Sequence, residues 1–174
     1  GENRIKATAF SNQRTESVAD EIIVFYEGVK SPADLYMLVI GIDKYKNPKY
    51  NLNYAIADAN AFKKQVESGS NTIFRKREVV YLPDNQATKE RIGAAFNSLK
   101  MKAKPNDVFI FYYAGHGVMS EEQKSEFYIV PHDVTQLYGN NEMLKTNGIS
   151  AKELQEFSKQ LQARKQLFVF DACQ

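Results

Sequence analysis

The sequence predicts an α/β domain in which a parallel sheet is covered by helices on both faces. Apolar runs such as residues 35–42 alternate along the chain with segments whose apolar residues recur every three or four positions. The order is strand, helix, strand, helix, strand, a short extended excursion, helix and strand, which is typical of parallel sheets with right-handed crossovers. The continuous apolar run at 35–42 is expected of a strand that is buried on both sides.

Residues 1–30 have a different pattern. Apolar and polar residues alternate over 4–10, a β-rich run follows at 21–26, and a polar stretch typical of a turn lies between them. Two such strands predict a β-hairpin, which is only marginally stable in water by itself. We therefore expect residues 1–30 to be an arm or the remnant of a preceding β-sandwich, and residues 31–174 to form the main domain.

The main domain is expected to begin with a strand, a helix and a second strand. After the strand at 35–42, residues 51–66 are typical of an amphipathic helix that ends near Gly69. The apolar positions of this helix are Leu52, Ala55, Ile56, Ala59, Phe62 and Val66. Residues 78–82 then form the second strand, which Pro83 ends.

A second helix and a third strand follow. Residues 90–99 are typical of a helix, with Thr88 before it as an N-cap. Its apolar stripe consists of Ile92, Ala95, Phe96 and Leu99. The third strand begins at Asp107 and runs directly into His116.

The last part of the chain returns to the sheet. A polar loop after His116 leads to a short extended segment at 127–130. Ser150 and Glu153 then have the spacing of a capping box, which predicts the start of a helix that continues past residue 160. Residues 166–173 are expected to form the final strand, which ends on the only cysteine.

Composition excludes several classes of protein. The 174 residues suit one medium domain with a small appendage, and 25% charged with 43% hydrophobic residues is an ordinary globular composition. A net charge of +2, with scattered basic residues, gives no sign of a nucleic-acid partner. The single cysteine excludes an internal disulfide, and no apolar run is long enough to span a bilayer. No signal-peptide core follows the N-terminus, so a cytoplasmic location is expected.

Two reactive side chains follow predicted strands. His116 lies between Gly115 and Gly117, and the sole cysteine, Cys173, stands at the end of the last expected strand, after its apolar run. Alone, the histidine is more often an exposed bystander and the cysteine a buried small hydrophobe. Together at the carboxyl ends of strands they suit a cysteine nucleophile with a histidine acid and base, and Gly117 offers an N–H for the oxyanion.

Two other kinds of site fit less well. A metal site built from His116, His132 and Cys173 lacks both a close ligand pair and a fourth ligand. A nucleotide- or flavin-binding domain would share the order of strands and helices. However, the stretch after the first strand contains only one glycine, Gly41, and no phosphate-binding motif.

The two motifs resemble those of caspase-like peptidases, the group that contains caspases, metacaspases, paracaspases and bacterial relatives. The strand ending in Tyr-Ala-Gly-His-Gly carries the histidine motif, and Asp-Ala-Cys-Gln carries the cysteine motif. Residues 39–43 and 52–59 are also similar to the first strand and the following helix of the family. The resemblance covers roughly residues 35–174.

The resemblance implies a three-layer caspase-like fold (the caspase-hemoglobinase fold) that is incomplete at its C-terminus. The family sheet has about six strands, and this chain supplies the first four and the nucleophile. A C-terminal small-subunit fragment is therefore an expected partner, and the chain alone is expected to be inactive or incomplete. The implied activity is that of a cysteine endopeptidase of the bacterial, metacaspase-type branch, acting on protein or peptide substrates. The alternative is an interaction or scaffold module with an unused dyad.

Departures from caspases point to the specificity. Caspases have a glutamine at the position of Asp171 and an arginine-bearing pocket in the region of Asp58, whereas metacaspases are similar to this chain at both. The resemblance implies that Asp58 and Asp171 form an acidic S1 pocket for Arg or Lys. The alternatives are an exposed helix residue at Asp58 and a strand-end hydrogen-bonding group at Asp171. Ala114 replaces a serine common in metacaspases, so one pocket wall is expected to differ.

Calcium is the one cofactor that the resemblance raises. Some metacaspases bind it with acidic residues near the position of Asp133. A single carboxylate falls short of the six or more oxygen ligands that Ca²⁺ takes. No cofactor is therefore expected, and calcium activation stays open.

Overall fold

The computed structural model describes residues 2–25, 32–121 and 126–172. Contacts divide the chain into two compact units, Gly1–Ser31 and Pro32–Gln174. No helix in the described part is long and apolar enough to cross a bilayer. Residue 26, the end of the expected strand at 21–26, and Cys173, the end of the last expected strand, lie outside the described residues.

The first unit is the predicted antiparallel hairpin. Strand β1 (Glu2–Ala7) pairs with β2 (Asp20–Phe25), and every residue of both strands is exposed. The expected strand at 4–10 is shifted to Glu2–Ala7, although Phe10 still forms an isolated antiparallel bridge with Glu16. The turn itself lies in the polar stretch, as predicted, where the Arg14 N–H donates to the Ser11 carbonyl and the Ser11 N–H donates to the Thr15 carbonyl.

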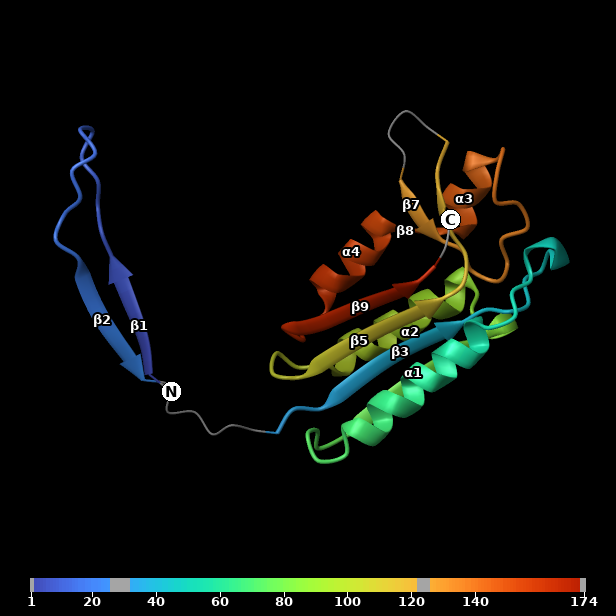
Figure 1. Cartoon of the computed structure of the whole chain (residues 1–174), viewed down its shortest axis with the longest axis horizontal. Helices are drawn as coiled ribbons and strands as arrows, with labels where there is room; N and C mark the ends of the chain where they lie inside the picture. Colours follow the sequence, from blue (N-terminus) through green and yellow to red (C-terminus); the bar gives the residue numbers. More distant parts are fainter. Residues whose placement is uncertain (1, 26–31, 122–125, 173–174) are drawn as a thin grey trace. The chain divides into compact units, whose positions relative to one another are not determined.

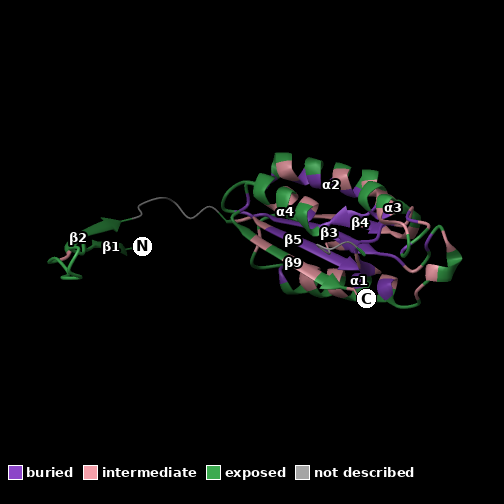
Figure 2. Cartoon of the chain, turned by 90° about the horizontal axis from the view of Figure 1, so that it is seen from above, coloured by how far each residue is buried: buried purple, intermediate pink, exposed green. Residues whose placement is uncertain are grey.

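The second unit contains the predicted parallel sheet (Figure 1). Its four strands lie in the order β4-β3-β5-β9, and all three pairings are parallel. The strands are β3 (Leu35–Gly41), β4 (Arg77–Pro83), β5 (Val108–Ala114) and β9 (Lys165–Asp171). Every residue of β3 is buried, as its continuous apolar run predicts (Figure 2).

Helices cover both faces of this sheet. Helix α1 (Ala55–Gly69) packs on one face, while α2 (Lys89–Lys102) and α4 (Ala151–Gln160) pack on the other (Figure 2). The odd-numbered residues of β3 belong to the apolar cluster with α1, and the even-numbered ones to the cluster with α2 and α4. This alternation follows from the two-residue period of a strand. The predicted three-layer α/β class is therefore confirmed.

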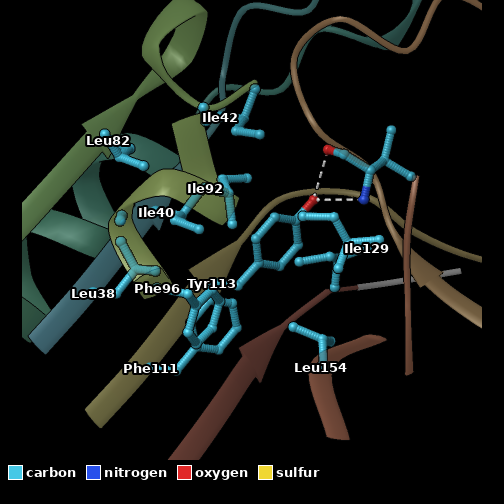
Figure 3. Packing of buried hydrophobic residues seen from close by; sticks show 14 of the residues in the cluster. Leu38, Ile40, Ile42, Leu82, Ile92, Phe96, Phe111, Tyr113, Ile129 and Leu154 are labelled. Carbon is cyan, nitrogen blue, oxygen red and sulfur yellow. Dashed lines mark hydrogen bonds between the residues drawn. The ribbon is translucent and has the colours of Figure 1, made fainter. Parts of the chain in front are cut away.

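The core on the α2 and α4 side is rich in aromatic rings. Phe96 stacks on Phe157 with ring centroids 4.4 Å apart and lies 5.4 Å from Phe111. The expected stripe of α2 is buried in full: Ile92, Ala95, Phe96 and Leu99. Tyr113 is wholly buried, and its hydroxyl bonds to the backbone of Val130 (Figure 3). A buried hydroxyl at the end of β5 thus ties the sheet to the chain beyond it.

Both predicted helix caps form. The Thr88 hydroxyl accepts a hydrogen bond from the Arg91 N–H at the start of α2. At the start of α4, Ser150 and Glu153 make the reciprocal bonds of a capping box. The local sequence signals therefore fix these two helix starts.

Helix α1 starts later than expected, at Ala55 rather than residue 51. The Asp43 carboxylate accepts from the Ala55 N–H at 2.8 Å and caps the helix from a distant part of the chain. The side chain of Asn51 is used elsewhere, accepting from the Tyr45 N–H at 2.9 Å. Residues 51–54 therefore form a loop after the short 3₁₀ turn η1 (Pro48–Tyr50).

The extended segment expected at 127–130 is present as strand β7 (Phe127–Ile129), but several other small elements were not predicted. The chain after His116 is not only a polar loop, since β6 (Gly117–Met119) pairs there with β7, and β7 with β8 (Ile149–Ser150). The remaining elements are the 3₁₀ turn η2 (Asp84–Gln86) and helix α3 (Asn141–Asn147). Asn140 caps α3 by accepting from the Met143 N–H.

Candidate functional site

The ends of β5 and β9 bring the two sequence motifs side by side. In the parallel register, Ala114 is paired with Asp171, and the Gly115 N–H donates to the Asp171 carbonyl at 3.1 Å. His116 is two residues past Ala114, and Cys173 is two residues past Asp171. Cys173 itself lies outside the described residues, so its side chain is not placed.

The described residue just before the cysteine lies close to the glycine just after the histidine. A Cβ atom built on Gly117 would lie 3.2 Å from the Cβ of Ala172, and 2.6 Å from the ring of Phe127. Only glycine leaves room for these neighbours. The two motifs therefore lie next to each other at Gly117 and Ala172.

Two residues of the loop after β3 form hydrogen bonds with His116. Its Nε2 lies 2.8 Å from the carbonyl oxygen of Tyr50, and its backbone N–H donates to the Tyr45 hydroxyl at 2.8 Å. A carbonyl can only accept, so Nε2 carries the proton in this bond and Nδ1 is the acceptor nitrogen. The half-buried ring is thus fixed in one tautomer, with Nδ1 able to take up a proton.

Two buried tyrosines support the turn that carries the histidine. The Tyr113 hydroxyl donates to the His116 carbonyl at 2.7 Å, while Tyr45 binds the N–H of the same residue. Burial raises the pKa of Tyr45 to about 12 and raises the pKa of Tyr113 well above its ordinary value. Both hydroxyls therefore stay protonated. A Cβ on Gly115 would lie 2.6–2.7 Å from these two hydroxyls, which explains the glycine before the histidine.

The N–H of Gly117 is directed away from β7. The Val130 N–H donates to the His116 carbonyl at 3.0 Å, and Gly117 is opposite Ile129 in the antiparallel pair. Residues alternate in such a ladder, so the residue after His116 turns its own N–H and C=O to the other side. This orientation leaves the Gly117 N–H on the outer edge of β6, the edge strand of its sheet.

The two predicted acidic residues line the same pocket as the histidine. This pocket has a volume of about 500 Å³. Asp58 comes from the first turn of α1 and Asp171 from the end of β9, and both are exposed. The pocket is lined by Tyr50, Asn51, Leu52, Asn53, Tyr54, Ala55, Asp58, Ala114, Gly115, His116, Leu137, Tyr138 and Asp171.

Asp171 also accepts a hydrogen bond from a residue that does not line the pocket. The hydroxyl of Tyr112 on β5 donates to Oδ2 of Asp171 at 3.2 Å. The strand-end hydrogen bond and the pocket position considered from the sequence are therefore both present. One carboxylate oxygen is tethered while the residue still lines the cavity.

The remaining candidates lie elsewhere. His132 is half-buried and does not line the pocket, and its Nδ1 is 2.6 Å from the Lys44 carbonyl. Asp133 accepts from the Lys89 N–H at 3.4 Å, at the start of α2. Within the described ranges, no three His, Cys, Asp or Glu side chains are grouped so that they could hold a metal ion.

The residues that orient the histidine and Asp171 were not predicted from the sequence. Tyr50 acts through its carbonyl, which no side-chain pattern can reveal. Tyr112 and Tyr113 looked like ordinary members of a buried strand, although a tyrosine hydroxyl in a strand core needs a polar partner. That requirement was the one available signal.

Known proteins are similar to this chain over most of its length. A family model described as the caspase domain matches residues 35–174. A probable protease from a Desulfuromonadales bacterium is 27% identical over 153 residues, which make up 79% of this chain and 18% of the relative. A crystal structure of a protein from Geobacter sulfurreducens superposes with a TM-score of 0.61 at 19% identity, over 82% of this chain and 51% of that one. The chain thus spans under a fifth of the curated relative and about half of the solved structure.

Proposed function

This chain belongs to the caspase-domain family, and from that premise we propose that it is the large-subunit part of a cysteine endopeptidase with Cys173 as nucleophile and His116 as general acid and base. The observation that carries the proposal is the parallel pairing of Ala114 with Asp171, because each reactive residue then follows its strand by the same two positions. Side chains at the carboxyl ends of adjacent parallel strands lie at one edge of the sheet.

The proposed reaction uses the fixed tautomer of the histidine. Nδ1 of His116 accepts the thiol proton of Cys173, and the thiolate attacks the carbonyl carbon of the scissile bond. The Gly117 N–H donates to the resulting oxyanion. The imidazolium then protonates the leaving amine, which departs and leaves a thioester. Water, deprotonated by His116, hydrolyses the thioester and restores the thiol.

Cleavage after Arg or Lys is proposed from the acidic pocket. Asp58 and Asp171 line one cavity with His116, so a cationic side chain in it would have carboxylates nearby while its backbone reaches the histidine. This charge matches the metacaspase-type branch of the family. The proposed chemistry requires no cofactor, and calcium activation remains to be tested by adding Ca²⁺ to the full-length protein.

A C-terminal small-subunit segment is the proposed partner. Strand β9 ends the strand order of the sheet, and beside it lies an apolar pocket of about 400 Å³. Half-exposed aromatic side chains such as Phe170 are costly to leave in water. The pocket is lined by Phe127, Ala151, Leu154, Gln155, Ser158, Phe168 and Phe170. A segment covering this edge would also complete the site near Cys173.

The test is a peptide library cleaved by the full-length protein. Turnover that Cys173→Ala abolishes, with Arg or Lys as the preferred P1 residue, is the expected result. Asp58→Asn should lower kcat/KM for these peptides by about tenfold, because one charged contact is lost. A clear preference for Asp at P1 would contradict the acidic pocket. Failure of Cys173 to react with an Arg-derived electrophilic peptide would instead favour a scaffold module.

A further inference from the structure

We propose that Tyr112 is a positioning residue that holds the carboxylate of Asp171 in one orientation and thereby makes the pocket favour arginine over lysine. The inference rests on the proposed function, since it concerns the S1 pocket of that peptidase. It assigns a role to a buried strand residue that does not itself line the cavity.

Tyr112 reaches Asp171 from below the pocket. It is on β5, only 5% exposed, and its hydroxyl is 3.2 Å from Oδ2 of Asp171 on the neighbouring strand β9. Ala114 pairs with Asp171 and lines the pocket, and Tyr112 is two residues earlier on the same face of the strand. Tyr112 therefore lies next to the pocket wall, on the same face of the sheet.

Helix α1 clamps the ring of Tyr112. Phe62 stacks on it with centroids 4.2 Å apart and planes inclined by 17°. Phe62 is four residues after Asp58, so the two lie on one face of α1. The same helix therefore supplies one acidic residue of the pocket and fixes the support of the other.

The Tyr112–Asp171 hydrogen bond limits the orientations in which the Asp171 carboxylate can bind a ligand. Burial, and then the neighbouring charge of Asp171, raise the pKa of Tyr112 to about 12, so the hydroxyl keeps its single proton for this bond. Because the Tyr112 hydroxyl donates to Oδ2, the hydrogen bond restricts the orientation of the Asp171 carboxylate. A guanidinium has planar donors in fixed directions and gains from such a carboxylate, whereas an ammonium is a compact charge with rotatable donors. Orientation of Asp171 thus favours Arg more than Lys.

The experiment compares two peptides that differ only in Arg or Lys at P1, cleaved by the full-length protein. Tyr112→Phe keeps the ring and its stacking but removes the bond. It should lower kcat/KM about tenfold for the Arg peptide, mainly through KM, and less than about threefold for the Lys peptide. Tyr36→Phe is the matched control, because Tyr36 is also 5% exposed and its hydroxyl donates to the Lys102 carbonyl. It should leave the Arg to Lys ratio unchanged.

A second pair of variants tests whether Tyr112 acts through Asp171. In an Asp171→Ala background, Tyr112→Phe should cause no further change in kcat/KM for either peptide. Phe62→Leu alone should shift the ratio of the Arg to the Lys kcat/KM in the same direction as Tyr112→Phe, but by less. An unchanged ratio in an active Tyr112→Phe enzyme, or additive effects in the double variant, would overturn this inference alone. Absence of Cys173-dependent cleavage in the wild-type protein would overturn the proposed function and this inference with it.

Discussion

The hydroxyl of Tyr45 accepts a hydrogen bond of 2.8 Å from the backbone N–H of His116, across 71 positions of sequence. The same tyrosine ring lies 5.1 Å from the imidazole, tilted by 47°. The loop after β3 therefore determines where the histidine sits, although the histidine is carried by β5. A change in this loop should disturb the chemistry without touching either reactive residue.

Replacing Tyr45 with Phe should lower kcat about tenfold while KM changes less than about threefold, because the ring remains but the His116 N–H loses its acceptor. The free energy of unfolding should fall by about 1–3 kcal/mol, the cost of an unpaired buried N–H. Steady-state kinetics and denaturant unfolding measure the two effects. A variant with wild-type kcat and lowered stability would show that the bond is structural only.

Stability should also decline at alkaline pH. Burial raises the pKa of Tyr45 from its ordinary value of 10.0 to about 12. Between these values the unfolded chain releases a proton that the folded chain keeps, so the contribution is complete below pH 10 and is lost as pH rises toward 12. Denaturant midpoints measured across this range should fall, and less steeply in Tyr45→Phe. If the denaturant midpoint falls equally steeply with pH in the wild type and in Tyr45→Phe, the loss of stability cannot be assigned to Tyr45.

The glycine before the histidine gives a stability prediction with an internal control. Gly115→Ala would place a Cβ 2.6 Å from the Tyr113 hydroxyl and 2.7 Å from that of Tyr45, and should cost about 1–3 kcal/mol of folding free energy. Gly93→Ala in α2 meets no atom within 4 Å and should stabilise the protein by about 0.5–1 kcal/mol through helix propensity. Thermal or denaturant unfolding checks both signs. Equal effects of the two substitutions would refute the close-packing explanation.

The layers of the fold could be predicted because they follow from local patterns. The buried run of β3, the stripe of α2 and the capping box of Ser150 each encode their element within a few residues. Elements fixed by partners outside their own residues could not be predicted. Helix α1 starts where Asp43 caps it, and β6 exists because it pairs with β7. The side-chain pattern within each element does not contain those contacts.

The same division applies to the candidate site. The glycines around His116 and the acidic residues were visible in the sequence, and the structure places His116, Asp58 and Asp171 around one pocket. Their supports were not visible. Tyr50 binds the imidazole through a backbone carbonyl, and Tyr112 meets Asp171 only because β5 and β9 are adjacent. Positioning residues depend on strand order and register, which the pattern of one chain does not determine.

Gly117 gives the last prediction, because a side chain added there would meet both the ring of Phe127 and Ala172. In Gly117→Ala the new Cβ would lie 2.6 Å from Phe127 and 3.2 Å from the Cβ of Ala172. In the proposed mechanism, a displaced Ala172 would disturb the adjoining Cys173, the proposed nucleophile, relative to Gly117, the proposed oxyanion donor. We expect kcat to fall by about a hundredfold or more, the loss typical of a missing oxyanion contact. Active-site titration and single-turnover kinetics measure the effect apart from folding.

A double variant separates the two contacts of Gly117. Phe127→Leu removes the ring atoms nearest the new Cβ, so Gly117→Ala combined with Phe127→Leu should regain part of the lost stability. The contact with Ala172 remains in that variant, and kcat should therefore stay low. Phe127→Leu alone, which leaves Gly117 intact, should keep kcat within about threefold of wild type. Recovery of full kcat in the double variant would mean that Gly117 serves only the packing of Phe127, and would remove the link between this glycine and the nucleophile.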